Sequence, residues 1–413
     1  MERTVAFVTL GCKLNYAETS TMARAFAEKG YTHVEATVPA GIYVINTCSV
    51  TEHADKKCRN IIRRLHKLNP DARIIVTGCY AQLKPDEIMS LEGVYAVLGA
   101  RDKNRTVEIA TGGDSGIYSS PRAGAVNFMK AYSSGERTRS FLKVQDGCDY
   151  FCTYCTVPFA RGASRNVPIA DLVEQAQAIA ATGAREIVLT GVNTGDFGRS
   201  TGESFLDLIK ALDKVEGIER YRISSIEPNL LTDEIVEWIA NGSKFLPHFH
   251  IPLQSGCDKI LAAMHRRYDT AFFEKKMEFI RSRMDNVFFG IDIIAGFPGE
   301  SDEDFMETYN FLERTAPAFI HIFPYSRRAG TVAATMNNQV QECVKTRRVQ
   351  MLEELCERLH ESFCRANDGR SEQVLFESSV KGGKMFGYTR NYIRVERPYD
   401  SSAIGNIVDV VLP

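Results

Sequence analysis

Residues 140–155 read SFLKVQDGCDYFCTYC, an apolar stretch typical of a buried strand followed directly by three cysteines. Cys148, Cys152 and Cys155 have the spacing C-x3-C-x2-C. A structural zinc site normally takes four ligands, and no further His or Cys follows at zinc-finger spacing. Closely spaced thiolates suit an iron–sulfur cluster, and three of them leave one iron of a four-iron cluster open for chemistry. The spacing predicts a reactive metal centre; a zinc site and chance spacing are the alternatives.

From this stretch onward, short apolar runs alternate with helical patterns until about residue 338. Helices are predicted over 168–181 and 303–313, and Ser301 with Asp304 resembles a capping box for the second. Six strand–helix units are fewer than the eight of a closed TIM barrel, so residues 137–338 are predicted to form a partial (β/α)6 barrel. The cysteine loop would lie at the C-terminal end of its first strand, where barrel enzymes hold their active sites. The strands are predicted at 140–145, 186–190, 220–225, 248–253, 288–294 and 319–323.

The first 115 residues predict a separate α/β domain with an open parallel sheet, because strand-like runs alternate with helical patterns over 15–29 and 54–68. Three successive strand-like runs, VAFVTL, IYVINT and RIIVTG, are each followed within two residues by a cysteine: Cys12, Cys48 and Cys79. The carboxyl edge of such a sheet is where ligands bind. The three thiols are therefore predicted to converge on a second metal site with an open position; three buried cysteines that only pack are the alternative.

Three further segments complete the chain. Residues 116–136 are predicted to be a linker, 339–368 a connecting amphipathic helix, and 369–413 a small all-β module. Basic and aromatic side chains are interleaved in this module, as contact with single-stranded RNA requires. A solvated strand face is the alternative interpretation. The candidate RNA-binding residues are Lys381, Lys384, Phe386, Tyr388, Arg390, Tyr392, Arg394 and Arg397.

The composition is that of an ordinary globular protein, with 44% hydrophobic residues and a formal net charge of −2. A nucleic-acid partner must therefore be met by a local basic patch. The N-terminal stretch lacks the pattern of a signal peptide, and no run of about 18 apolar residues could span a bilayer. We expect a cytoplasmic protein without membrane contact, whose eleven cysteines are not disulfide-bonded. For five of these cysteines we predict only a packing role in the protein interior: Cys58, Cys257, Cys343, Cys356 and Cys364.

The central motif, including the aromatic Tyr154 before its last cysteine, resembles that of the radical S-adenosylmethionine superfamily. The resemblance implies a 4Fe-4S cluster on Cys148, Cys152 and Cys155 whose open iron binds S-adenosylmethionine, which is cleaved to a 5′-deoxyadenosyl radical. GIDIIAGFPG (290–299) resembles the adenine-contacting motif of that family, and Asn193 stands where many relatives carry a glutamate that binds the methionine amino group. The candidate cofactor-binding residues are Tyr154, Asn193, Glu227, Gln254, Ile294, Gly296 and Pro298, with Arg161 and Arg266 as weaker candidates.

Two cysteine triads together resemble the methylthiotransferase family, which replaces an unactivated C–H bond by a methylthio group. The resemblance covers nearly the whole chain, through TLGCKLN, NTCSVTEHADKKCR, VTGCYAQ and HIPLQSGCDKILAAMHRRY, and it implies that the C-terminal module is a TRAM domain. TLGCKLN resembles the branch that acts on N6-threonylcarbamoyladenosine in the tRNA anticodon loop, at position 37. The sister branches modify isopentenyladenosine in tRNA or an aspartate of a ribosomal protein.

The resemblance also implies two 4Fe-4S clusters, S-adenosylmethionine as both methyl donor and radical source, a sulfur source, and an electron donor such as flavodoxin or ferredoxin. Two other readings compete with this one. A cobalamin-dependent radical methyltransferase would carry an Asp-x-His-x-x-Gly motif, which this chain lacks. An RNA-binding protein merely stabilised by iron–sulfur clusters would not need triads with open sites.

Overall fold

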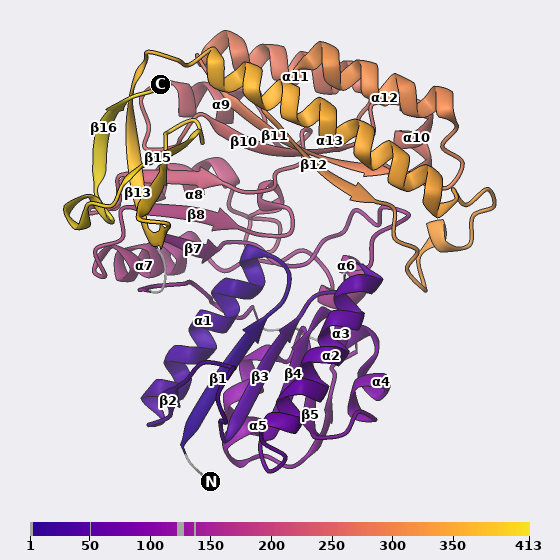
Figure 1. Cartoon of the computed structure of the whole chain (residues 1–413), viewed down its shortest axis with the longest axis vertical. Helices are drawn as coiled ribbons and strands as arrows, with labels where there is room; N and C mark the ends of the chain where they lie inside the picture. The colour runs from indigo at the N-terminus through magenta and orange to yellow at the C-terminus, as the bar shows by residue number, and fades with distance from the viewer. Residues whose placement is uncertain (1–2, 50, 122–127, 136–137) are drawn as a thin grey trace.

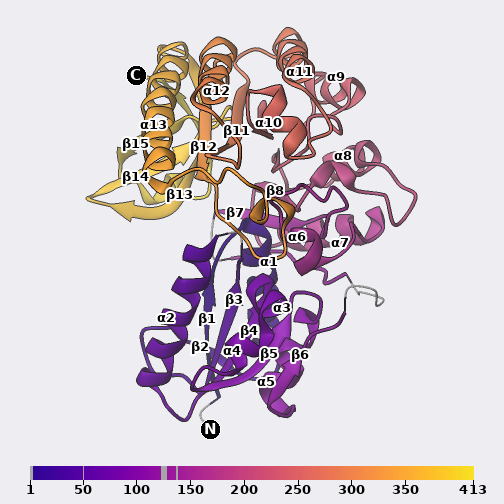
Figure 2. The same ribbon diagram turned by 90° about the vertical axis from the view of Figure 1, so that its right-hand side faces the viewer.

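The computed structural model describes residues 3–49, 51–121, 128–135 and 138–413. Figure 1 shows the N-terminal sheet at one end of the molecule and the central strands, with the long helix α13 beside them, at the other. The quarter turn in Figure 2 keeps this arrangement, and the N-terminal end of α1 points towards the junction. In the described part of the chain, none of the helices has an apolar stretch of the length that crossing a membrane requires.

The N-terminal sheet has six parallel strands in the order β2-β1-β3-β4-β5-β6. Its central strands are apolar and β-branched, as strands covered on both faces must be. The strands are β1 (Thr4–Thr9), β2 (Thr32–His33), β3 (Ile42–Thr47), β4 (Arg73–Gly78), β5 (Val94–Gly99) and β6 (Gly116–Tyr118). The helices are α1 (Lys13–Glu28), α2 (Glu52–Leu68), α3 (Cys79–Leu83), α4 (Pro85–Met89), η1 (Lys103–Arg105) and α5 (Thr106–Gly112).

The sheet extends further than the sequence predicted. The three expected strands and two expected helices are present, but β2, β5 and β6 were missed. Gly116–Tyr118 was assigned to a linker and instead pairs with β5 as the edge strand. Its three residues are too few to show a strand period. Residues 122–127, also in that predicted linker, lie outside the described residues.

The central part contains all six predicted strands, within one or two residues of the expected bounds. They form two three-stranded parallel sheets, β7-β8-β9 and β10-β11-β12, linked by single parallel bridges at Tyr221–Phe245 and Ser225–His250. The strands are β7 (Arg139–Lys143), β8 (Glu186–Thr190), β9 (Arg220–Ile223), β10 (His248–Gln254), β11 (Phe288–Ala295) and β12 (Phe319–Pro324).

Helices between the central strands pack against them around one large apolar core. The capping box predicted at Ser301 and Asp304 begins α12, because each side chain accepts a hydrogen bond from the other residue's backbone N–H. The segments are α6 (Val157–Arg161), α7 (Ile169–Ala180), η2 (Thr194–Asp196), α8 (Phe205–Asp213), α9 (Asp233–Ala240), α10 (Asp258–Ala263), α11 (Thr270–Arg283), α12 (Asp302–Thr315) and η3 (Val332–Ala334).

The predicted connecting helix is α13 (Glu342–Arg365), which packs its apolar face on β12. The C-terminal segment forms an antiparallel sheet in the order β15-β14-β13-β16, with a small core of its own. Its elements are β13 (Ser371–Lys381), β14 (Lys384–Tyr388), β15 (Arg394–Pro398), η4 (Ser401–Ala403) and β16 (Ile407–Val411). Figure 1 shows this sheet beside the β7–β8 side of the central strands.

Candidate active site

The central triad, Cys148, Cys152 and Cys155, lies on the loop between β7 and α6. The loop turns at Gly147, where φ is +74° and a Cβ atom would lie 2.1 Å from the carbonyl oxygen of Ala163. Only glycine fits there, so the residue before the first cysteine is fixed by sterics. The Cys148 N–H then donates to the carbonyl of Gly162 at 3.0 Å, which closes the loop at its base.

Two N–H groups donate to sulfur atoms of the central triad. Arg266 Nη1 lies 3.1 Å from Cys152 Sγ, and the backbone N–H of Val157 lies 3.4 Å from Cys155 Sγ. Burial raises the pKa of the Cys148 and Cys155 thiols to about 12 each. A metal bound in place of those protons would neutralise the charge of the buried thiolates. N–H···S contacts are a known means of adjusting the reduction potential of an iron–sulfur cluster. The donor set therefore fits an iron–sulfur cluster.

Polar side chains from the next two strand ends are linked to this triad through Arg266. Glu227 forms an ion pair with Arg266, and burial raises the Glu227 pKa. Asn193 follows β8, is 2% exposed, and accepts from the Glu227 N–H at 3.4 Å. The Nδ2 group of Asn193 has no hydrogen-bond partner within the described part of the chain. A buried, unpaired amide of this kind suits a polar ligand.

A cavity of about 260 Å³, here called the Tyr154 cavity, adjoins the central triad. Tyr154, Gln254 and Ile294 line it together with Cys155, so three predicted cofactor-binding residues from separate segments meet there. Phe297, which the sequence reasoning did not single out, packs edge-on against Tyr154. Gly296 has a different role: a Cβ there would lie 2.4 Å from Lys345 of α13, so this glycine permits helix packing. Pro298 is buried beside it.

The N-terminal triad, Cys12, Cys48 and Cys79, lies just beyond the carboxyl ends of β1, β3 and β4. Thr47 pairs with Gly78, so Cys48 and Cys79 are the next residues of neighbouring strands. A Cβ on Gly11 would lie 2.9 Å from Cys48 Sγ, and one on Gly78 would lie 2.4 Å from the Thr47 carbonyl oxygen. Each glycine therefore permits a close approach next to a cysteine, and the predicted convergence of the three strand ends is present.

A buried ionic group joins the N-terminal sheet to the central part. Glu18 of α1 pairs with Lys103, Lys143 and Arg161, while Asp146 pairs with Lys143, Arg161 and Arg165. Four cations thus face two carboxylates, an excess of two positive charges. The cations hold the pKa of Glu18 far below its usual range despite burial. Negative charge on Cys79 or Cys12 would stabilise the Arg161 guanidinium. The excess of positive charge in this ionic group would therefore offset an anionic centre on the N-terminal triad.

Arg161 is therefore placed differently from its prediction as a cofactor-binding residue. It is 3% exposed and donates to Glu18, Asp146 and Asn15, at the junction of the two parts. The two triads are close neighbours across that junction. Thr156, which follows Cys155, donates to the carbonyl of Ser49, which follows Cys48, at 3.5 Å.

Two more cavities meet at Lys13, the residue after Cys12. The Cys12 cavity, about 330 Å³, is lined by Cys12, Lys13, Arg139 and Arg222 among others. The histidine cavity, about 380 Å³, is lined by His250, His321 and Tyr388, and both cavities share Lys13, His248 and Tyr392. Enclosure by protein lowers the Lys13 pKa. Of the residues that line these cavities, Cys12, Tyr388, Tyr392 and Arg394 were predicted as site residues. Lys13 and the histidines were not, although the alternation of His248, His250 and Gln254 along one strand was a usable signal.

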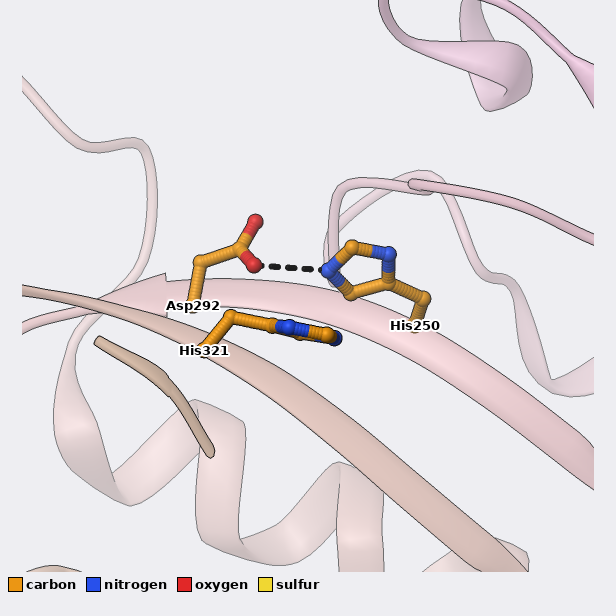
Figure 3. Close-up of side chains that lie close together, drawn as sticks. All are labelled: His250, Asp292 and His321. Atoms are coloured by element: carbon orange, nitrogen blue, oxygen red, sulfur yellow. Dashed lines mark hydrogen bonds and ion pairs between the residues drawn. The ribbon is translucent and has the colours of Figure 1, made fainter. Parts of the chain in front are cut away.

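His250, Asp292 and His321 project from the adjacent strands β10, β11 and β12 (Figure 3). Their ligand-type atoms lie within 4.8 Å of one another, and His250 Nε2 is 2.7 Å from Asp292 Oδ1. Burial lowers the His321 pKa to about 4, so that imidazole is neutral at neutral pH. The group is a hydrogen-bonded pair with a neutral neighbour. It stands between the histidine cavity and the Tyr154 cavity, which Asp292 also lines.

The predicted RNA-binding residues divide into two sets. Lys381, Lys384, Arg390 and Arg394 are exposed, and Arg394 lies over the Phe386 ring at 4.6 Å. Arg397 is half-buried and pairs with Asp400. Tyr388 and Tyr392 stack on each other and face inward. Tyr392 contacts His248 and Arg139, so it docks the C-terminal sheet on the central strands.

Family comparisons match most of the chain. A model described as "Uncharacterized protein family UPF0004" matches residues 4–99, and the Radical SAM superfamily model matches residues 142–312. Threonylcarbamoyladenosine tRNA methylthiotransferase MtaB of Bacillus subtilis is 41% identical, over 98% of this chain and 93% of that protein. The Aquifex aeolicus protein of the same name is 36% identical over 99% and 100%. The tRNA-2-methylthio-N(6)-dimethylallyladenosine synthase of Sphingopyxis alaskensis is 35% identical over 97% and 93%.

Among solved structures, the cobalamin-bound radical S-adenosylmethionine methyltransferase TsrM of Kitasatospora setae superposes with a TM-score of 0.59. It covers 81% of this chain and 77% of its own, at 15% identity, and so shows likeness of fold alone. The relatives match nearly the full length of the chain, and the two family models cover most of the N-terminal sheet and most of the central strands. The chain belongs to the methylthiotransferase family of radical S-adenosylmethionine enzymes.

Proposed function

We propose that this enzyme converts N6-threonylcarbamoyladenosine at position 37 of tRNA into its 2-methylthio derivative. Full-length similarity to enzymes named threonylcarbamoyladenosine tRNA methylthiotransferase supports the choice of substrate. The contact between Thr156 and Ser49 is the observation that supports the mechanism. That contact brings the loop of the central triad beside the N-terminal triad, so two chemical steps can act on one base. Holding both reagents next to the base is the proximity problem that such a reaction has to solve.

In this proposal each triad holds one 4Fe-4S cluster. Cys148, Cys152 and Cys155 hold the first, with S-adenosylmethionine in the space bounded by Tyr154, Asn193, Glu227, Gln254 and Ile294. Cys12, Cys48 and Cys79 hold the second. When bound, these groups supply radical C–H activation and a sulfur to be methylated. The unpaired amide of Asn193 and the Arg266–Glu227 pair suit the amino and carboxylate groups of the methionine part of S-adenosylmethionine. Tyr154 and Phe297 suit the adenine of the same molecule.

The overall exchange breaks the C2–H bond of the adenine and forms a C–S bond. The hydrogen leaves in 5′-deoxyadenosine, the methyl group comes from a second S-adenosylmethionine, and the sulfur from a separate source. A low-potential electron donor of the flavodoxin or ferredoxin type would supply the one electron that starts cleavage of the first S-adenosylmethionine, which leaves as methionine and 5′-deoxyadenosine. Bond formation between the adenine radical and the methylthiolate would release one electron again, so the exchange consumes no net electron. An anticodon-loop base suits this chemistry because it can be turned out of its stack.

The C-terminal sheet is proposed to be the TRAM domain that contacts the tRNA, in a cytoplasmic enzyme. Its exposed set of Lys381, Lys384, Arg390 and Arg394 suits phosphates, and Phe386 offers a stacking face. The proposed domain organisation is 1–115, 137–338 and 369–413, with 116–136 as linker and 339–368 as connecting helix. Because Gly116–Tyr118 completes the N-terminal sheet, the first domain reaches at least to Tyr118.

Mass spectrometry of tRNA nucleosides tests the substrate. Cells that lack this enzyme, and have no paralogue, should lose 2-methylthio-N6-threonylcarbamoyladenosine and accumulate the unmethylthiolated nucleoside. Expression of the wild-type chain should restore it, whereas a variant with all three central cysteines changed to alanine should not. Persistence of the methylthio nucleoside in the deletion strain would refute the assignment, and loss of a methylthio isopentenyladenosine instead would point to the sister branch.

Iron and sulfide analysis tests the second cluster. A triple alanine variant at Cys12, Cys48 and Cys79 should lose about half of the iron of the anaerobically reconstituted enzyme, because two equal clusters become one. A Cys58→Ala variant, at a buried position of helix α2 beside the same sheet, is the matched control and should keep full iron content. Unchanged iron in the triple variant would refute a cluster at the N-terminal triad.

A further inference from the structure

The Cys12 cavity and the histidine cavity adjoin each other at Lys13, His248 and Tyr392. Lys13 begins α1, directly after Cys12, so its side chain lies next to the proposed sulfur-handling site. The side chain is exposed to the cavities and enclosed by central strands on one side and Tyr392 on the other. A ligand that binds beside Cys12 would therefore contact the Lys13 ammonium group.

The positive charge of Lys13 is the one left unbalanced here. Arg139 pairs with Glu377 at 2.6 Å, and Arg222 pairs with Glu186 at 2.7 Å. Among the described residues, no carboxylate lies within ion-pair distance of Lys13, and none of those that line the Cys12 cavity is acidic. Burial keeps His248 and His321 neutral at neutral pH by lowering the pKa of each. The cavity thus presents one uncompensated cation, which favours an anionic ligand.

The names of the relatives point to two substituents of very different chemistry at the same nitrogen. The threonylcarbamoyl group ends in a carboxylate, whereas the dimethylallyl group is a hydrocarbon. An enclosed ammonium group attracts the carboxylate of the threonylcarbamoyl group. A dimethylallyl group would displace water from the ammonium group and offer it no charge or hydrogen bond in return. One residue could therefore both attract the right adenosine and reject the wrong one.

We propose that Lys13 binds the threonine carboxylate of N6-threonylcarbamoyladenosine in the Cys12 cavity, and that it is the residue that selects this substrate over apolar N6 substituents. The inference rests on the proposed function and adds the means of substrate choice. It also orients the base, because anchoring the N6 substituent next to Cys12 fixes the adenine relative to the N-terminal triad.

A phosphate of the anticodon loop is the competing ligand. Exposed cations suited to phosphates lie on the C-terminal sheet, at Lys381, Lys384, Arg390 and Arg394. Lys13 instead lines the Cys12 cavity together with Tyr392 and His248. The position of Lys13 therefore favours contact with the modified base over contact with a backbone phosphate.

The test measures binding of anticodon stem-loop RNA to the cluster-loaded, full-length enzyme by fluorescence anisotropy. Two RNAs are compared: one carries N6-threonylcarbamoyladenosine, and the other its carboxamide analogue, in which the carboxylate is a neutral amide. Wild-type enzyme should bind the carboxylate form about 10- to 100-fold more tightly, as expected for a charge-assisted contact. Lys13→Met should abolish that ratio while leaving affinity for the carboxamide unchanged, and Lys13→Arg should retain part of it.

Lys275→Met, at an exposed position of α11, is the control and should retain the full ratio. Equal loss of affinity for both RNAs in Lys13→Met would show a phosphate contact and overturn the proposal, as would an undiminished ratio. Because the two RNAs are also compared on wild-type enzyme, equal affinities there would overturn it without any variant. Methylthiolation of the carboxylate RNA by wild-type enzyme is assayed in parallel, and only failure of that conversion counts against the proposed function.

Discussion

Gly11 and Gly78 determine how closely the strand ends of the N-terminal triad approach one another. Both have positive φ angles, +98° and +111°, and both lie against the chain around Cys48. A side chain at Gly78 would have to displace backbone atoms of Thr47 that are held in the parallel sheet, and one at Gly11 would collide with the side chain of Cys48. The geometry of the three thiols is thus set by residues that carry no chemistry themselves.

At this scale, Gly78→Ala should destabilise the enzyme and reduce its iron content. The new Cβ would meet the Thr47 carbonyl oxygen, and alanine is strained at that φ, at a cost of about 1–3 kcal/mol. Gly112→Ala is the matched control, because nothing lies within 4 Å of a Cβ there, and it should leave both quantities close to wild type. Urea unfolding and iron analysis measure them; an unaltered Gly78→Ala protein would show that the close approach is not required.

At the scale of elements, helix α1 connects the two halves of the site. Its N-terminal end carries Lys13 beside Cys12, and one turn later Glu18 anchors three cations, two of them from the central part. The helix packs against β7, the strand that leads into the central triad. A shift of α1 would therefore move both triads relative to each other.

Glu18→Gln should cost about 3–5 kcal/mol of unfolding free energy, because it leaves buried cations without their partner. Glu28→Gln, at the exposed last residue of the same helix, should have almost no effect. Guanidinium unfolding of both variants makes the comparison. A Glu18→Gln variant as stable as Glu28→Gln would mean that Asp146 alone satisfies the cations.

Sequence reasoning predicted the elements well where the pattern is local. Apolar runs locate the parallel strands, and parallel topology requires that residues following them share one edge, which is why the N-terminal triad could be proposed. The central triad follows from the spacing of its cysteines on one loop. Sequence reasoning did not predict which side chains face each other across the junction. Arg161 was named as a weaker candidate for cofactor contact, and its network with Glu18 depends on docking that no local pattern encodes. His250, Asp292 and His321 were missed because they meet only when three strands pair.

At the scale of the whole molecule, three parts of the chain enclose one set of cavities. Cys12 and Lys13 come from the N-terminal sheet domain, the histidines from the central strands, and Tyr388 with Tyr392 from the C-terminal sheet. Arg222 donates to the carbonyl oxygens of Thr389 and Arg390, so the C-terminal sheet is fixed to the strands that line the cavity. If that sheet binds tRNA as proposed, it can present a base to the cavities directly.

The most direct test of the account is a single reaction of the reconstituted enzyme with an anticodon stem-loop whose threonylcarbamoyladenosine carries deuterium at C2. With S-adenosylmethionine, a sulfide source and a reductant, mass spectrometry should find the 2-methylthio nucleoside without that deuterium, and deuterium in the released 5′-deoxyadenosine. Release of unlabelled 5′-deoxyadenosine with the nucleoside unchanged, while an isopentenyladenosine stem-loop is converted under the same conditions, would contradict it.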